Sequence, residues 1–333
     1  MRILGAAVVL LLLAGCTSEP PVEPVETETP VVEPVTVEQP AQVFDGDCAA
    51  IFSDAALSEA LGQPLTEMWA GQEVPADWLP PLSPESLLVE QVGGVHCSWS
   101  APSTAPDDFP SPVLVVAAVP ASAVSAPEDT DCVATDMSAT GCPIDVTANG
   151  IRLSGLVTSD LPGADPRARV AAVEALFLAS ASGAAAPATQ TPLDGAWQTP
   201  ADCASIAASL DRKALGEIDP ISSDDSMGTD AYASVVEVNL RGGRYIYTCS
   251  LNGETFSVSF SLLGGGAWNR DAVLAQEGAE VVDLTGYDLV VESPRNGGTI
   301  DIFDGVNWLH SEGNDPELTY PSLRVVVDAL NAP

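Results

Sequence analysis

The sequence predicts an α+β protein of two tandem repeats, each an antiparallel β-sheet flanked by an N-terminal and a C-terminal helix. Three observations lead to this prediction: a motif that occurs twice, strands that alternate in polarity, and a similar helix at the end of each copy. The motif Asp47-Cys48-Ala49-Ala50-Ile51 recurs as Asp202-Cys203-Ala204-Ser205-Ile206. Two copies of this length suit two ordinary domains.

The duplication extends well beyond this motif, with the same features in the same order. Leu61-Gly62, Gly93-Gly94 and Cys97 follow the first copy, and Leu215-Gly216, Gly242-Gly243 and Cys249 follow the second. We therefore assign the first repeat to residues 47–182 and the second to residues 201–333. Residues 183–200, which are rich in alanine, proline and threonine, are the predicted linker.

Local signals place the elements of the first repeat. Asp47 and Ser53 are predicted N-caps of two short helices, the second ending at Gly62. Apolar and β-branched runs bounded by turn residues predict the strands, and Gly93-Gly94 and Asn149-Gly150 predict hairpin turns. The strands are expected at residues 87–92, 95–100, 113–119, 144–146 and 151–157, and the closing helix at residues 166–179.

The second repeat alternates more strictly between apolar and polar residues. Tyr247, Cys249 and Leu251 alternate with polar residues, as do Val258 and Phe260. This period of two predicts an antiparallel meander with one covered face. Strands are expected at residues 236–240, 245–251, 256–262, 281–284, 287–291 and 299–303, and the final helix at residues 323–330.

Seven cysteines are present, six of them inside the repeats. An even set in an exported chain indicates disulfide bonds. If the two repeats share a topology, the pairs are Cys48–Cys97, Cys203–Cys249 and Cys132–Cys142. A zinc site is the alternative, but no Cys-x-x-Cys spacing supports it.

The N-terminal residues 1–15 predict a cleaved signal peptide. Arg2 supplies a positive charge, and the apolar run 3–13 is too short to cross a bilayer. Leu13-Ala14-Gly15-Cys16 resembles the lipobox of bacterial lipoproteins, which implies cleavage before Cys16 and a diacylglyceryl group, with its palmitate-type chains, on the sulfur. The alternative is an ordinary secretory signal with an incidental cysteine. Residues 16–46 are then the lipidated cysteine and a disordered tether rich in proline and glutamate.

Several motifs together resemble actinobacterial surface lipoproteins of unknown function. They are Asp47-Cys48, Ile51-Phe52-Ser53, Leu57, Leu61-Gly62 and Cys97-Ser98-Trp99, and they cover the first part of each repeat. The second copy departs from the pattern, since Leu251 stands where the first has Trp99. The resemblance implies a location at the outer face of the cell membrane and a disulfide pattern, and it implies no functional residue.

The charge of the chain limits its partners. The formal net charge is -36, with a single lysine, Lys213, so the surface repels nucleic acid and anionic lipid headgroups. We expect no nucleic-acid partner, and we expect the covalent lipid to hold the protein at the membrane.

Candidates for catalysis are few, so the sequence predicts a protein that is not an enzyme and has no cofactor or metal centre. His96, beside Cys97 in a strand, is expected to be exposed, and His310 is expected in a loop or strand end. None of the common hydrolase or phosphate-binding motifs occurs. Two acidic groups could bind calcium or remain solvated: Asp224, Asp225 and Asp230, and Glu312, Asn314, Asp315 and Glu317.

Aromatic residues are the candidate contacts for an envelope protein or a small ligand. Trp69 and Trp78 lie in an apolar insertion of the first repeat, and Trp268, Trp308 and His310 are the candidates in the second. Both indoles of the insertion could instead fill the core. The sequence thus predicts an anchored binding or scaffold module, with a solute-binding lipoprotein of an importer or an envelope hydrolase as alternatives.

Overall fold

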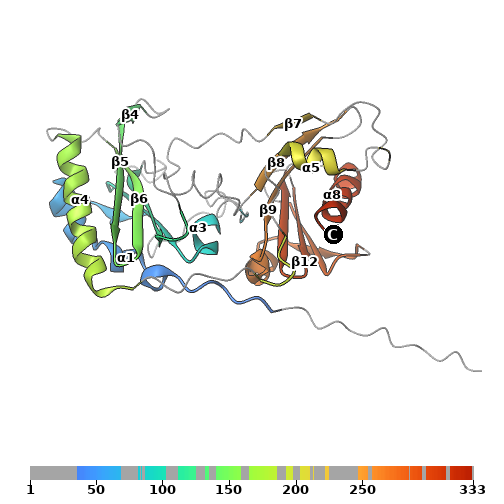
Figure 1. Ribbon diagram of the computed structural model, residues 1–333, viewed down its shortest axis with the longest axis horizontal. Coiled ribbons are helices and arrows are strands. Elements are labelled where there is room, and N and C mark those ends of the chain that lie inside the picture. The colour runs from blue at the N-terminus through green and yellow to red at the C-terminus, as the bar shows by residue number, and fades with distance from the viewer. Residues whose placement is uncertain are drawn as a thin grey trace, which may run out of the picture. The chain divides into compact units, whose positions relative to one another are not determined.

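The computed structural model describes residues 36–68, 82, 84, 87–102, 112–124, 132–134, 140–158, 165–185, 193–197, 203–210, 213, 222–224, 247–253, 257–284, 286–294, 298–312 and 316–331. All of them belong to one compact unit, Pro34–Pro333. Their strands form two antiparallel sheets, one of six strands and one of seven (Figure 1). The predicted α+β class is confirmed. Among the described residues, no helix is both long and apolar enough to cross a membrane.

The first sheet has the strand order β1-β2-β3-β6-β5-β4. Asn149 and Gly150 connect β5 to β6 with φ angles of 49° and 76°. A two-residue type I′ turn needs this left-handed backbone at both positions, so the predicted hairpin is confirmed. The strands are β1 Thr66–Glu67, β2 Val95–Ser100, β3 Pro112–Pro120, β4 Val133–Ala134, β5 Thr140–Ala148 and β6 Ile151–Thr158.

Two helices of the first half, the part of the chain that contains the first sheet, begin where the sequence places their caps. Asp47 accepts a hydrogen bond from the Ala49 amide and Ser53 accepts one from the Ala56 amide, as predicted for N-caps. Asp165 caps the longest of these helices through the Arg167 amide. The helices are η1 Val43–Gly46, α1 Cys48–Ile51, α2 Asp54–Leu61, α3 Leu88–Gln91, α4 Pro166–Ser180 and η3 Ala181–Gly183.

The second sheet has the strand order β10-β11-β12-β13-β9-β8-β7. Its strands are β7 Ser222–Asp224, β8 Tyr247–Asn252, β9 Ser257–Leu263, β10 Glu280–Val282, β11 Leu289–Ser293, β12 Thr299–Asp304 and β13 Asn307–Glu312. The helices of this half are α5 Cys203–Ser209, η4 Gly266–Asn269, α7 Arg270–Leu274 and α8 Pro316–Leu330. Strand β13 was not predicted, and the strand predicted at residues 236–240 lies outside the described residues.

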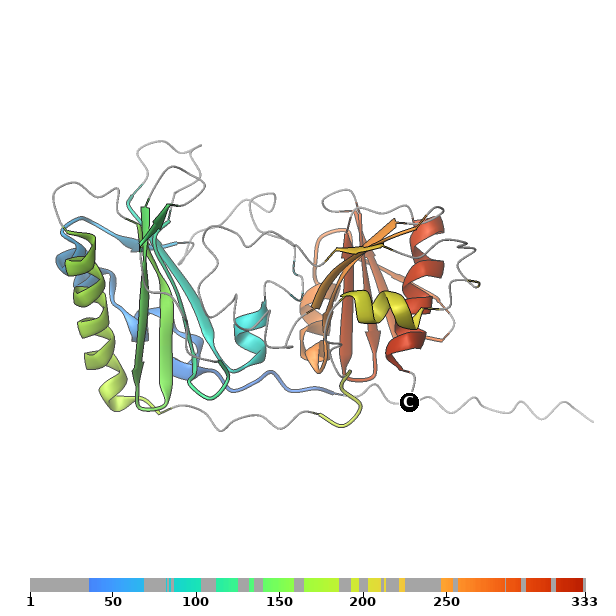
Figure 2. The same cartoon turned by 45° about the horizontal axis from the view of Figure 1, so that its top comes forward.

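Each sheet buries one face beneath helices. In the first half, helix α4 lies against the sheet (Figure 2). Its residues Val173 and Phe177 pack with the apolar residues of β2, β3, β5 and β6. In the second half, Ile206 of α5 and Leu323 of α8 pack on the corresponding apolar residues. A third apolar cluster combines residues on the opposite faces of the strands with residues of α3, η4 and α7: Leu88, Val89, Ala117, Val119, Leu263, Ala267, Val273, Leu289, Val291, Phe303 and Trp308.

All three predicted disulfide bonds are present: Cys48–Cys97, Cys132–Cys142 and Cys203–Cys249. Two of them join the first helix of a half to a strand of its sheet, since Cys48 opens α1 and Cys203 opens α5. The three disulfides thus fix the chain within each half and leave none of these six cysteines as a free thiol.

Four predictions about local structure are wrong. Residues 87–92 were expected as a strand, but Leu88–Gln91 form the helical turn α3. The amides of Gly93 and Gly94 donate to the carbonyls of Glu90 and Val89, and Gly93 has a φ of 79°, so the glycine pair ends a helix instead of turning a hairpin. His310 lies within strand β13 and not at a loop, and α8 starts at Pro316 instead of residue 323.

Candidate functional site

A row of polar side chains crosses the face of the second sheet that is opposite α5 and α8. Alternation along β12 and β13 places Asp301, Trp308 and His310 on this face, because their neighbours Ile302 and Leu309 point into the helix-covered core. The register sets Asp301 directly across from His310, and His310 across from Ser261 of β9. Three adjacent strands therefore contribute to one polar cluster, which we call the Asp301 cluster: Ser261, Asp301, Trp308, His310 and Glu312.

The carboxylate of Asp301 organises this cluster. Its Oδ1 accepts hydrogen bonds from Trp308 Nε1 and from His310 Nδ1, both at 2.8 Å. On the other side of the imidazole, His310 Nε2 lies 3.5 Å from Glu312 Oε1. The ring of Phe303 stacks on the indole of Trp308, with the ring centroids 6.0 Å apart. The imidazole is therefore fixed between two carboxylates.

This placement sets the charge of His310. Burial by itself lowers the pKa of His310, but the hydrogen bonds with Asp301 and Glu312 outweigh burial and raise it to about 9. The same interaction with His310 lowers the pKa of Glu312. At neutral pH the ring is therefore an imidazolium, which serves as the counter-charge of Asp301 and cannot accept a proton as a general base.

The second oxygen of Asp301 is free of donors. Asp301 is 0% exposed, and within the described part of the chain no hydrogen-bond donor reaches its Oδ2. Ser293 of β11 lies on the same face of the sheet as Asp301, and its buried hydroxyl also lacks a hydrogen-bond partner among the described residues. Because buried polar atoms in proteins are nearly always hydrogen-bonded, two such atoms on one sheet face require an explanation.

A related arrangement occurs on the first sheet. Asp145 of β5 lies across from Ser154 of β6, and seven residues separate Asp145 from Arg152 as seven separate Asp301 from Trp308. Arg152 binds both carboxylate oxygens, with Nε donating to Oδ1 at 2.6 Å and the terminal nitrogen donating to Oδ2 at 2.8 Å. The guanidinium thus gives each oxygen of the Asp145 carboxylate a hydrogen bond. The indole and the imidazole, by contrast, both donate to the same oxygen of Asp301.

Comparison with known proteins does not extend these observations. Protein-family models, curated proteins and solved structures give no match to this chain. The site must accordingly be interpreted from its own geometry.

The aromatic candidates from the sequence have different positions. Trp69 and Trp78 lie outside the described residues, as does Cys16. Trp268 of η4 is half-buried, and its Nε1 donates to Gln91 Oε1 at 2.7 Å. Trp308 and His310, by contrast, come together at Asp301, so of the five candidates only these two share a site among the residues that the structure describes.

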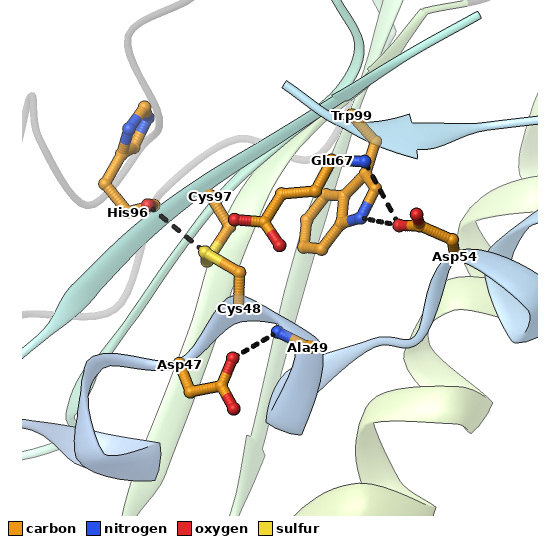
Figure 3. The surroundings of a disulfide bond; sticks show 8 residues. All are labelled: Asp47, Cys48, Ala49, Asp54, Glu67, His96, Cys97 and Trp99. Atoms are coloured by element: carbon orange, nitrogen blue, oxygen red, sulfur yellow. Dashed lines mark hydrogen bonds between the residues drawn. A yellow bond between two sulfur atoms is a disulfide. The ribbon is translucent and has the colours of Figure 1, made fainter. Parts of the chain in front are cut away.

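The side chains around the Cys48–Cys97 disulfide make contacts that hold secondary-structure elements together (Figure 3). Cys48 Sγ lies 3.6 Å from the His96 carbonyl oxygen, and the buried Trp99 donates from Nε1 to Asp54 Oδ1 at 3.2 Å. Asp54 Oδ1 also accepts from the Glu67 amide at 3.1 Å. Burial, followed by the charges of Asp54 and Asp47, raises the pKa of Glu67. These side chains join α1, α2, β1 and β2 around the disulfide.

Neither acidic group proposed for calcium is assembled among the described residues. Asp225, Asp230, Asn314 and Asp315 lie outside them, and Glu312 contacts His310. Within the described ranges, no three acidic, histidine or cysteine side chains are grouped as metal ligands would be.

Sequence reasoning missed Asp301, Ser293, Asp145 and Arg152. One signal was present: in Thr299-Ile300-Asp301-Ile302-Phe303 the acid lies between apolar residues at a position that faces into the protein. The unusual feature of the site, a carboxylate that keeps one acceptor open, depends on side-chain geometry across strands and could not be read from the sequence.

Proposed function

We propose that this protein is a lipid-anchored, extracytoplasmic lipoprotein that acts as a binding or scaffold module in the cell envelope. The observation that carries the proposal is the set of three disulfides, because such bonds persist in oxidising compartments outside the cytosol. The segment Leu13-Ala14-Gly15-Cys16 adds the anchor, since it resembles a lipobox behind an apolar signal.

The anchor is tested by replacing Cys16. We expect Cys16→Ala to move the protein from the membrane fraction to the medium and to abolish labelling with a palmitate analogue, because two acyl chains provide stable attachment. Ser18→Ala is the matched control, since it changes a neighbouring residue outside the quartet and should leave both readouts unchanged. Membrane retention and labelling of the Cys16→Ala variant would contradict the proposal.

We also propose that the two halves are a tandem duplication. The orders β1-β2-β3-β6-β5-β4 and β7-β8-β9-β13-β12-β11-β10 follow the same path through the sheet, with one extra edge strand in the second. In each half a cysteine of the second strand in this path, Cys97 or Cys249, is bonded to the first residue of a helix. The Asp145 and Asp301 hairpins further support the proposal, because each acid lies seven residues before its donor.

A binding role fits the chemistry of the Asp301 cluster better than hydrolysis does. A hydrolytic base must accept a proton near neutral pH, whereas His310 already carries one and is enclosed by Asp301 and Glu312. Fixed charges in a buried site suit recognition of a charged or hydrogen-bonding group.

The Trp69 and Trp78 segment is the proposed partner surface. Cross-linking on living cells, followed by identification of captured proteins, should give neighbours that disappear when both tryptophans are replaced by alanine. Leu178→Ala is a suitable control because it removes an exposed apolar side chain, 49% accessible, elsewhere in the chain. Unchanged capture together with a large fall in melting temperature would instead assign the two indoles to the core.

A further inference from the structure

The three disulfide bonds differ in how firmly the rest of the fold holds their two cysteines together. Cys48–Cys97 joins α1 to β2, and Cys203–Cys249 joins α5 to β8. Both of these strands have a neighbouring strand on each side. The four cysteines are at most 9% exposed and belong to the two helix-covered cores. Packing and strand pairing therefore keep these sulfur atoms together even when the bond is reduced.

The Cys132–Cys142 bond lies at the edge of the first sheet. Strand β4 is two residues long, and β5 is the one strand beside it in the part of the chain that the structure describes. The register pairs Val133 with Gly141, so Cys132, one residue earlier, lies directly across from Cys142. The ladder between the two strands has two other residue pairs. The disulfide is therefore a main support of β4 at the sheet.

The second half shows how the equivalent strand is held without a disulfide. By the tandem duplication proposed above, β11 corresponds to β4, since both lie next to the strand that carries the conserved position of Asp145 or Asp301. Strand β11 is five residues long and pairs with β10 and β12 on its two sides. It contains no cysteine. The first half thus uses a covalent bond where the second half uses strand pairing.

Exposure also distinguishes this bond from the other two. Cys142 is 1% exposed and lies in the first core cluster, whereas Cys132 is half-buried. Thiol–disulfide exchange requires a thiolate to reach one sulfur of the bond, so access to that sulfur limits the rate. An external thiol reaches this bond at Cys132, and local opening of the short edge strand is enough to admit it. The other two bonds require a helix to leave its core.

We propose that Cys132–Cys142 is a redox-sensitive clasp, a disulfide that a dithiol reductant opens in the folded protein while the other two bonds stay closed. A thiolate of the dithiol attacks Cys132 Sγ, the S–S bond breaks, and its electron pair leaves on Cys142 Sγ, which takes up a proton. The second thiol of the reductant then attacks the mixed disulfide and releases Cys132 as a thiol. Two electrons and two protons pass to the protein, and the reductant becomes a cyclic disulfide.

Opening the clasp releases the edge strand. With only two residue pairs left, β4 separates from β5, and the outer edge of β5 loses its neighbour. The bond stays closed in an oxidising compartment and responds to dithiol reductants. This inference goes beyond the binding or scaffold role proposed above, and it depends neither on the lipid at Cys16 nor on Trp69 and Trp78.

Graded reduction of the full chain in detergent tests the order of opening. The folded protein is treated with dithiothreitol, the thiols that appear are alkylated, and peptide mass spectrometry assigns each cysteine. We expect Cys132 and Cys142 to be alkylated together, at least about tenfold faster than the four other bonded cysteines, because local opening is far more populated than loss of a core. The two buried disulfides are controls within the same molecule. In concentrated guanidinium chloride, where the fold is lost, the three bonds should open at similar rates.

Hydrogen exchange tests the release of the strand. Reduction under the same conditions should raise amide exchange in peptides that cover β4 and β5 and leave it unchanged in peptides that cover β8 and β9. The double variant Cys132→Ser, Cys142→Ser should show the same increase without reductant.

Three results would overturn the proposal. One is that Cys48–Cys97 or Cys203–Cys249 opens first, or that all three bonds open together as the fold is lost. Another is that the same order persists in guanidinium chloride, since the fold would then not decide it. The third is unchanged exchange at β4 and β5 after reduction. The measurements on the unaltered chain decide this even where the double variant does not fold.

Discussion

The charge on His310 predicts a pH-dependent loss of stability in the alkaline range. Its pKa is raised from 6.5 to about 9 in the folded protein. A group whose pKa rises on folding stabilises the protein fully below its unfolded pKa, and that contribution disappears as the pH passes the folded pKa. A rise of this size corresponds to roughly 3 kcal/mol, at about 1.4 kcal/mol per pKa unit. The free energy of unfolding should therefore fall by roughly that amount between about pH 6.5 and about pH 9.

Urea unfolding at constant salt, repeated across this pH range, measures the effect. Tyr287 does not interfere, because burial, with the charge of Asp328 adding to it, raises its pKa to about 12. Burial and Glu292 likewise raise the pKa of Tyr320. His310→Gln should remove the slope, whereas His96→Gln, which changes the exposed histidine of β2, should keep it. A flat profile in the parent, or an equal slope in His310→Gln, would refute the reasoning about the buried imidazolium.

Three further predictions concern stability, each measured as a free energy of unfolding. Gly155→Ala should destabilise strongly, by about 2 kcal/mol or more, because a Cβ at this strand position would lie 2.1 Å from the Val115 carbonyl oxygen. Gly183→Ala, which meets nothing within 4 Å, is its control, and equal effects would contradict the packing argument. Replacing Cys203 and Cys249 together by serine should cost roughly 4 kcal/mol for a loop whose ends are 46 residues apart; an unchanged stability would show that the bond does not constrain the unfolded chain. Asp165→Ala should cost about 1 kcal/mol by removing the N-cap of α4, and Asp165→Asn, which keeps a capping oxygen, should cost less.

Local signals in the sequence were sufficient for much of the first half. Asn149-Gly150 specifies its hairpin turn because few other residues adopt positive φ at two successive positions. Asp47 and Ser53 specify helix starts because their side chains accept the otherwise unpaired amides of the first turn. The three disulfide pairs followed from the repeated spacing of the cysteines, which restricts the pairing far more than six isolated cysteines would.

The predictions that failed depend on interactions between distant residues. The apolar run at residues 87–92 is equally compatible with a strand and a short helix. In the structure it is a helix, and the helix buries Leu88 and Val89 in the third apolar cluster. Strand β13 was missed because Asn307-Trp308-Leu309-His310 does not alternate in polarity. Both of its faces are buried, one in the helix-covered core and the other at the Asp301 cluster, so the usual signal of a half-exposed strand is absent.

The two hairpins together explain why a histidine in a buried strand carries a charge. A carboxylate beneath a sheet face loses several kcal/mol of hydration and needs a counter-charge at hydrogen-bonding distance. In the first half that counter-charge is Arg152, and the residue two positions further along β6 is the neutral Ser154. In the second half Trp308 takes the place of Arg152. The positive charge lies two positions further along β13, on His310, which is on the same face of the sheet and directly across from Asp301. One cation is thus paired with the aspartate at this position in both halves, but an imidazole reaches only one carboxylate oxygen where a guanidinium reaches two. The open acceptor at Asp301 follows from that difference in shape and not from a defect in packing.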